Sequence, residues 1–142
     1  MKYHFKIHRE KSGYWAESIE LEGCQTQADN LEDLRHNMKE ALNVFLDEPD
    51  HSKIIFPLPK AGLKGRNIVP VEVFPEVACA FLLRRTRLLS GYTQHEMKVL
   101  LEFKSVFSYQ KLERARFSNP TLKSLLRIKR ALPKFPLSLL LS

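Results

Sequence analysis

The spacing of the apolar residues changes once along this chain of 142 residues, close to Pro75. Before Pro75, apolar and polar side chains alternate, as in Tyr3, Phe5 and Ile7, and this alternation is typical of strands with one buried face. After Pro75, the apolar residues recur at helical spacing. The sequence therefore predicts an α+β protein, with a small sheet domain over residues 1–74 and an all-α domain over residues 75–142.

In the first domain we expect the order β-β-β-α-β, a small sheet with one covering helix. The strands are predicted over residues 3–8, 14–21, 24–27 and 68–74. Asp29 or Asn30 is expected to cap the helix, which should end near Asp47 because Pro49 follows. Residues 54–59 are extended and bracketed by prolines, which suits an edge or a connector.

In the second domain the pattern predicts four helices, over residues 76–90, 93–101, 105–114 and 119–132. Gly91 is expected to end the first helix in a left-handed conformation. Thr93, with Glu96 three residues on, forms a predicted capping box, and Ser105 is the expected cap of the third helix. The apolar tail, residues 137–141, has no predicted place.

The two domains differ in charge. Residues 1–74 hold ten Lys and Arg against twelve Asp and Glu, whereas residues 75–142 hold thirteen against four. A strongly basic domain favours a polyanionic partner, because neutralising phosphates releases counterions. The second domain is therefore the candidate for nucleic-acid binding.

Two short helices joined by a tight turn fit a helix-turn-helix, whose second helix reads the major groove. Periodicity alone fits a generic basic helical bundle equally well. Polar side chains of the third helix are able to reach base edges and phosphates, namely Ser108, Gln110, Lys111 and Arg114, and Lys104 beside them adds phosphate attraction.

Four segments favour the helix-turn-helix over the generic helical bundle. They are 83–87 (LRRTR), 91–97 (GYTQHEM), 112–114 (LER) and 119–128 (NPTLKSLLRI). Together they resemble the XRE-type helix-turn-helix family. The resemblance implies that Gln94 and the stretch from Ser105 to Lys111 contact DNA, with Tyr109 in the core. Two departures are visible: Glu102 stands at the usual turn glycine, and the third-helix segment is one residue longer.

The first domain has its own resemblance. Residues 13–17 (GYWAE) and 21–34 (LEGCQTQADNLEDL) are similar to the HicB antitoxin family, with Ala28 at a position usually held by glycine. This resemblance implies a degenerate ribonuclease-H-like sheet that blocks a small HicA-type toxin that cleaves mRNA. It also implies a helix-turn-helix that represses the operon, and such repressors bind operator DNA as dimers at least.

Two alternatives remain: a stand-alone repressor whose N-terminal domain senses a ligand, and a ribonuclease-H-like nuclease. A nuclease needs carboxylates that converge on a metal ion. The acids of the first domain suit a solvated face and a helix start better; they are Glu17, Glu20, Glu22, Asp29, Glu32 and Asp33. We expect no enzyme activity, cofactor or metal, and a cytoplasmic protein in which Cys24 and Cys79 stay reduced.

Overall fold

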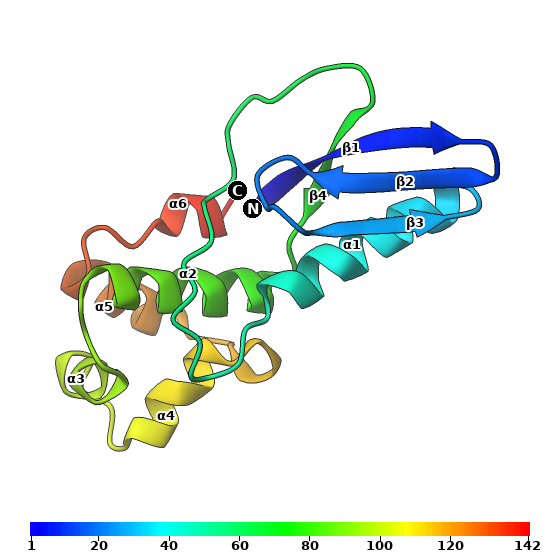
Figure 1. The fold of residues 1–142 in the computed structure, drawn as a ribbon. Helices are drawn as coiled ribbons and strands as arrows, with labels where there is room; N and C mark the ends of the chain where they lie inside the picture. Colours follow the sequence, from blue (N-terminus) through cyan, green and yellow to red (C-terminus); the bar gives the residue numbers. More distant parts are fainter. The chain divides into compact units, whose positions relative to one another are not determined.

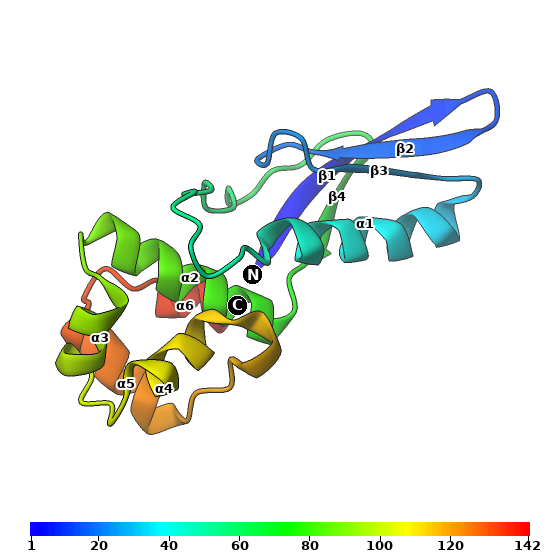
Figure 2. The same ribbon diagram turned by 60° about the horizontal axis from the view of Figure 1, so that its bottom comes forward.

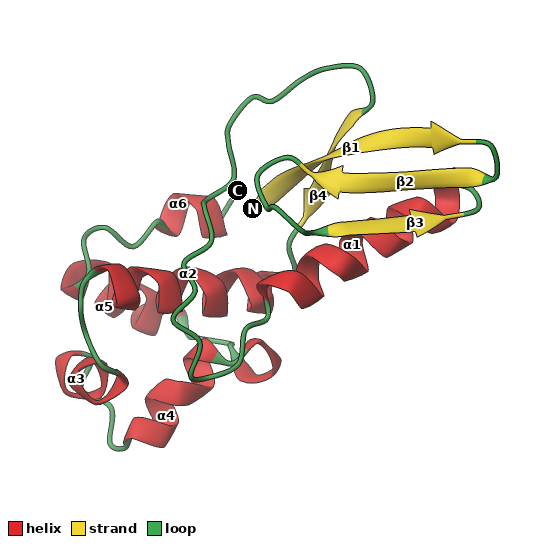
Figure 3. Ribbon diagram, viewed as in Figure 1, coloured by secondary structure: helices red, strands yellow, loops and turns green.

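A computed structural model describes residues 1–142, and these divide into two compact units. Unit 1 consists of Met1–Leu46 and Phe56–Val73, and unit 2 of Asp47–Ile55 and Phe74–Ser142. The fold is mixed, with one four-stranded antiparallel sheet and six α-helices (Figure 3). The segment 47–55, which the sequence places in the first domain, packs with unit 2.

The sheet of unit 1 has the order β3-β2-β1-β4, and every neighbouring pair is antiparallel (Figure 1). Its strands are β1 (Lys2–Glu10), β2 (Gly13–Ser18), β3 (Gln25–Ala28) and β4 (Ile68–Glu72). The four predicted strands are confirmed, although the second ends at Ser18 and the fourth at Glu72. Residues 54–59 form no strand.

Helix α1 (Leu31–Leu46) covers one face of this sheet (Figure 1). Asn30 caps the helix, because its Oδ1 accepts from the Asp33 N–H at 2.8 Å. The core of unit 1 joins sheet and helix residues that are almost fully buried: Tyr3, Phe5, Ala16, Leu34, Met38 and Leu42. Trp15 is half-buried outside this core and stacks on His8, with the ring centroids 4.1 Å apart.

Unit 2 is helical and is built around α2 (Pro75–Leu89), in which every residue from Val77 to Leu83 is buried. The other elements are α3 (Gln94–Leu100), α4 (Val106–Gln110), the 3-10 turns Lys111–Glu113 and Ala115–Phe117, α5 (Leu122–Ala131) and α6 (Leu137–Leu140) (Figure 2). The apolar tail that the sequence could not place thus forms α6. None of the helices is long and apolar enough to span a membrane.

Two predicted helix bounds in unit 2 are wrong. The third helix does not reach Arg114: α4 ends at Gln110, and Arg114 is extended, with φ −102° and ψ 115°. A tighter 3-10 turn, Lys111–Glu113, follows α4 instead, and it buries Leu112 and Glu113. The fourth helix starts at Leu122 rather than near Asn119, because Pro120 disfavours a helical conformation in the residue before it.

Candidate nucleic-acid interface

Helices α3 and α4 are short and are capped as predicted. The Thr93 side chain accepts from the Glu96 N–H, and the Glu96 carboxylate accepts from the Thr93 N–H, both at 3.1 Å. Ser105 Oγ accepts from the Ser108 N–H at 3.2 Å. These caps satisfy amide groups that a helix start leaves without partners, so they fix where each helix begins.

The connection between α3 and α4 turns at Glu102. Its φ of 58° lies in the left-handed region, which is unfavourable for a residue with a side chain. This is the position at which the XRE-type pattern has glycine, so the chain adopts the turn conformation without the residue that favours it. Gly91, at the end of α2, has the expected left-handed φ of 77°.

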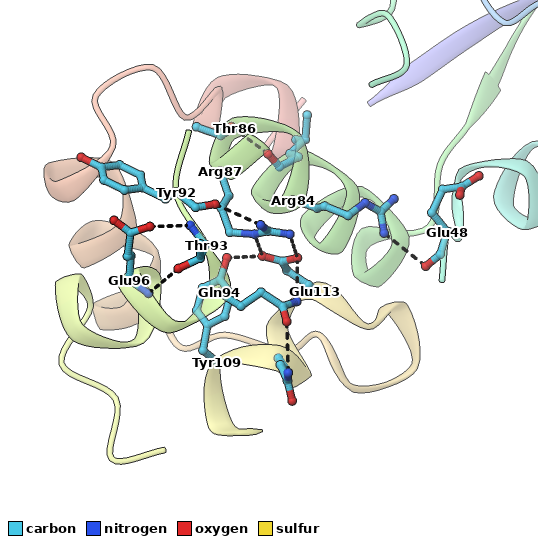
Figure 4. Close-up of polar contacts among 12 residues, drawn as sticks. Glu48, Arg84, Thr86, Arg87, Tyr92, Thr93, Gln94, Glu96, Tyr109 and Glu113 are labelled. Atoms are coloured by element: carbon cyan, nitrogen blue, oxygen red, sulfur yellow. Dashed lines mark hydrogen bonds and ion pairs between the residues drawn. The ribbon is translucent and has the colours of Figure 1, made fainter. Parts of the chain in front are cut away.

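A buried ion pair lies beneath α3 and α4 (Figure 4). Arg87 on α2 donates through Nε and Nη2 to the two oxygens of Glu113, at 2.6 and 3.0 Å. Burial alone lowers the pKa of Arg87, but the hydrogen bonds and charge of Glu113 outweigh it and raise that pKa. The Arg87 Nη1 also donates to the carbonyl of Tyr92 at 3.1 Å, which ties α2 to the start of α3.

Tyr109 completes this network from α4. Its hydroxyl donates to the Glu113 carboxylate, and the side chain is fully buried. Burial, followed by the charge of Glu113, raises the pKa of Tyr109, so the hydroxyl is protonated and donates near neutral pH. The prediction that Tyr109 belongs to the core is confirmed.

The network continues outward through two amides (Figure 4). Gln94 Nε2 donates to Glu113 at 3.3 Å, and Gln94 Oε1 accepts from Gln110 Nε2 at 3.0 Å. Because a carboxylate only accepts, Glu113 fixes the nitrogen of Gln94 inward and its oxygen toward Gln110. The oxygen of Gln110 and one of its N–H groups therefore remain for another partner.

The remaining predicted DNA contacts are arranged differently. Ser105 and Ser108 lie 3.0 Å apart, oxygen to oxygen, within the cap of α4. Lys104 is exposed on the connection, and Lys111 is exposed just after α4. Arg114 is not a free cation, since it donates to both oxygens of Asp50 at 2.8 to 3.1 Å. These hydrogen bonds, despite partial burial of the carboxyl, lower the pKa of Asp50.

The structure brings together two pairs of the predicted residues, Gln94 with Gln110 and Ser105 with Ser108. Phe107, which the sequence pattern did not single out, is 52% exposed on α4. The Lys111 Nζ lies 4.9 Å from its ring centroid and the Arg114 guanidinium carbon lies 5.8 Å from it. A signal was present, because Phe107 and Tyr109 are too close in sequence to share one face of a helix.

The charge of the chain lies in unit 2. That unit holds fourteen Lys and Arg against seven Asp and Glu, a net charge of +7, whereas unit 1 holds nine of each. The acidic excess of residues 1–74 disappears once Asp47, Glu48, Asp50 and Lys53 are counted with unit 2, with which they pack.

Comparison with known proteins adds no family to this description. No protein-family model matches the chain, and no curated protein is significantly similar to it.

The acidic residues of unit 1 do not converge. No three His, Cys, Asp or Glu side chains lie close enough together to hold a metal ion. Glu20 is buried and accepts from the His4 N–H and from His4 Nδ1, both at 2.8 Å, and from the Lys60 N–H at 3.1 Å. Its hydrogen bonds therefore join β1 to the segment before β4, a structural role.

Proposed function

We propose that the chain is an antitoxin of the HicB type, which neutralises a HicA-like toxin through unit 1 and represses its own operon through unit 2. The observation that carries the DNA-binding part is the capped pair α3 and α4. The buried carboxylate of Glu113 accepts a hydrogen bond from Gln94, and Gln94 in turn accepts one from Gln110. Gln110 keeps one oxygen and one N–H with which it can bond a base edge. In this proposal the pair is a helix-turn-helix, and α4 enters the major groove.

Each candidate residue then has a defined role. The free oxygen and N–H of Gln110 suit the N6 amino group and N7 of adenine, which an amide reads in a bidentate manner. Lys104 and Lys111 contribute phosphate attraction, and exposed Phe107 supplies an apolar contact to a thymine methyl group. Arg114 contributes less than Lys111 does, because Asp50 neutralises much of its charge.

The antitoxin part is supported by the resemblance over residues 13–17 and 21–34 and by the β-β-β-α-β order of unit 1. A net charge of zero leaves unit 1 without the repulsion that a basic unit would exert on a basic, RNA-cleaving partner. We also propose that this sheet is ribonuclease-H-like. The chain forms a homodimer in this proposal, and the dimer presents two copies of unit 2 to a palindromic operator.

A binding titration at several salt concentrations tests the repressor part. The probes are the DNA upstream of the gene and a scrambled duplex of equal length. Gln110→Ala should weaken binding to the upstream DNA by roughly 1–3 kcal/mol and leave the scrambled duplex almost unchanged. Lys111→Ala should weaken both and flatten the salt slope by about one unit.

Lys64→Ala, an exposed lysine of unit 1, is the matched control and should change neither duplex. Equal loss on both duplexes for Gln110→Ala would make Gln110 a backbone contact. If none of these variants matters, the basic surface is only solvated and the repressor role is wrong.

Co-expression of the full chain with the product of the neighbouring gene tests the antitoxin part. We expect the neighbour to encode a short basic protein that arrests growth alone, and that the full chain restores growth and co-purifies with it. A neighbour without toxicity, or a toxic one that the chain neither binds nor silences, would contradict the proposal. RNA incubated with the purified chain and magnesium tests the nuclease alternative.

A further inference from the structure

Unit 1 contains a half-open groove with a volume of about 720 Å³ between α1 and the β1–β4 side of the sheet. Its floor is apolar, formed by Ile7, Met38, Val69 and Val71, and Leu31 lies at its mouth. Leu31 is 43% exposed although it is the first residue of α1. The groove therefore leaves apolar side chains of the sheet and the helix partly in contact with water.

Three arginines from different elements line the same groove. They are Arg9 on β1, Arg35 on α1 and Arg66 just before β4. All three are exposed, and none of them takes part in an ion pair. Glu72 is the single acid of the lining. In a unit with no net charge, this is a local concentration of positive charge around an apolar floor.

The free edge of β4 does not suit an added strand. The Ile7 N–H donates to the Asn67 carbonyl and the Val73 N–H donates to the Met1 carbonyl, so residues 67, 69, 71 and 73 face β1. Pro70 therefore lies at an outward position, and it has no N–H to offer a further strand. A proline at an outward position disfavours pairing of this edge strand with a further strand.

We infer that this groove binds a small amphipathic carboxylate, with the apolar chain on the floor and the carboxylate among Arg9, Arg35 and Arg66. The guanidinium fork matches a carboxylate in a bidentate manner. A volume of about 720 Å³ and an apolar lining with a few charged groups are typical of small-molecule sites. A basic toxin does not complement this rim, so the site goes beyond the proposed function.

Calorimetric titration of the full chain tests the inference with two probes that share a tail, each kept below its critical micelle concentration. Dodecanoate should bind with a Kd of about 0.1 mM or lower. Dodecyltrimethylammonium, which has the same tail and a cationic head, should bind at least about tenfold more weakly.

Exposed positions allow variants that keep the fold. Arg35→Gln and Arg66→Gln should each weaken dodecanoate about threefold. Leu31→Glu should abolish its binding, because it places a like charge at the mouth. Lys6→Gln is the matched control: Lys6 is exposed on β1, is absent from the groove lining and should have no effect.

Three results would overturn the inference. The two probes could bind equally, which means that only the tail is recognised. Lys6→Gln could weaken dodecanoate as much as Arg35→Gln does, which means that only general charge matters. Dodecanoate could fail to bind while an acidic amphipathic peptide binds in an Arg35-dependent way, which makes the groove a protein-docking site. None of these results depends on DNA or toxin, so they leave the proposed function untouched.

Discussion

Arg87 and Glu113 lie 26 residues apart and meet in a buried, two-point ion pair that joins α2 to the segment after α4. Because Tyr109 and Gln94 also donate to Glu113, removing its carboxylate leaves several buried donors without a partner. We expect Glu113→Ala to lower the free energy of unfolding by about 3–5 kcal/mol, measured by urea denaturation.

Replacing both partners, as in Arg87→Met with Glu113→Leu, should cost less than Glu113→Ala alone, because no unpaired charge stays buried. Lys134→Ala, at an exposed position, is the control and should change the free energy of unfolding by less than about 0.5 kcal/mol. A Glu113→Ala variant as stable as this control would mean that the pair contributes nothing.

Glu102 offers a stabilising substitution. Its left-handed φ of 58° costs about 1–2 kcal/mol in a residue with a Cβ, and glycine removes this strain but loses more chain entropy on folding. We expect Glu102→Gly to raise the free energy of unfolding by about 0.5–1 kcal/mol in thermal or urea unfolding.

The reverse substitution is the matched control. Gly91 has a φ of 77°, and a Cβ added there meets no atom within 4 Å, so Gly91→Ala tests conformation without a steric clash. It should destabilise the protein by about 1 kcal/mol. If Glu102→Gly is destabilising instead, the Glu102 side chain contributes more than the left-handed conformation costs.

The features that the sequence predicted correctly are local. The caps at Thr93 and Ser105 depend on residues within three positions, and the alternation of Tyr3 and Phe5 needs only a strand with one buried face. Lys104 and Lys111 are exposed on either side of α4, and their predicted role in DNA binding stays a prediction.

The features that were missed depend on distant partners. The helix from Ser105 ends at Gln110 because Glu113 turns inward toward Arg87, and no periodicity within residues 105–114 records that pair. Likewise, Asp50 belongs with unit 2 because it meets Arg114, 64 positions away. The sequence also did not predict that Arg9, Arg35 and Arg66 line one groove, since only the fold brings β1, α1 and the segment before β4 together.

The Asp50–Arg114 pair should make the free energy of unfolding depend on pH in the acid range. Because the Arg114 hydrogen bonds hold the pKa of Asp50 below its ordinary value of 3.8, the folded state favours the ionised carboxyl. A depressed pKa contributes stability that is fully present above the unfolded value and is lost as the pH falls through the folded value. We expect Asp50→Asn to lose most stability relative to the parent above about pH 5, and to converge with it once the pH falls below the lowered pKa of the folded state.

Urea midpoints taken between neutral pH and acid measure this difference. Asp47→Asn, an exposed neighbour on the same segment, is the control and should change the urea midpoint at neutral pH far less than Asp50→Asn does. A constant gap between Asp50→Asn and the parent down to the most acid point would show that the ion pair is not its source.

The two free thiols, Cys24 and Cys79, should react slowly in the folded protein. Both are buried, and burial raises the pKa of Cys24 from its ordinary value of 9.0 to about 11. Only the thiolate is nucleophilic, so the thiolate population of Cys24 near neutral pH falls about a hundredfold, before restricted access is considered. Iodoacetamide labelling followed by mass spectrometry should show Cys24 modified at least about a hundredfold faster in denaturant than in buffer.

The same shift fixes the sign of an alkaline effect. A thiol whose pKa is raised on folding contributes stability below its unfolded value, and this contribution is lost as the pH rises through the folded value. The parent should therefore lose stability between pH 9.0 and about pH 11 more steeply than Cys24→Ala does. Rapid labelling of Cys24 in buffer, or identical alkaline slopes for the two proteins, would mean that this thiol is open to solvent at the end of the loop between β2 and β3.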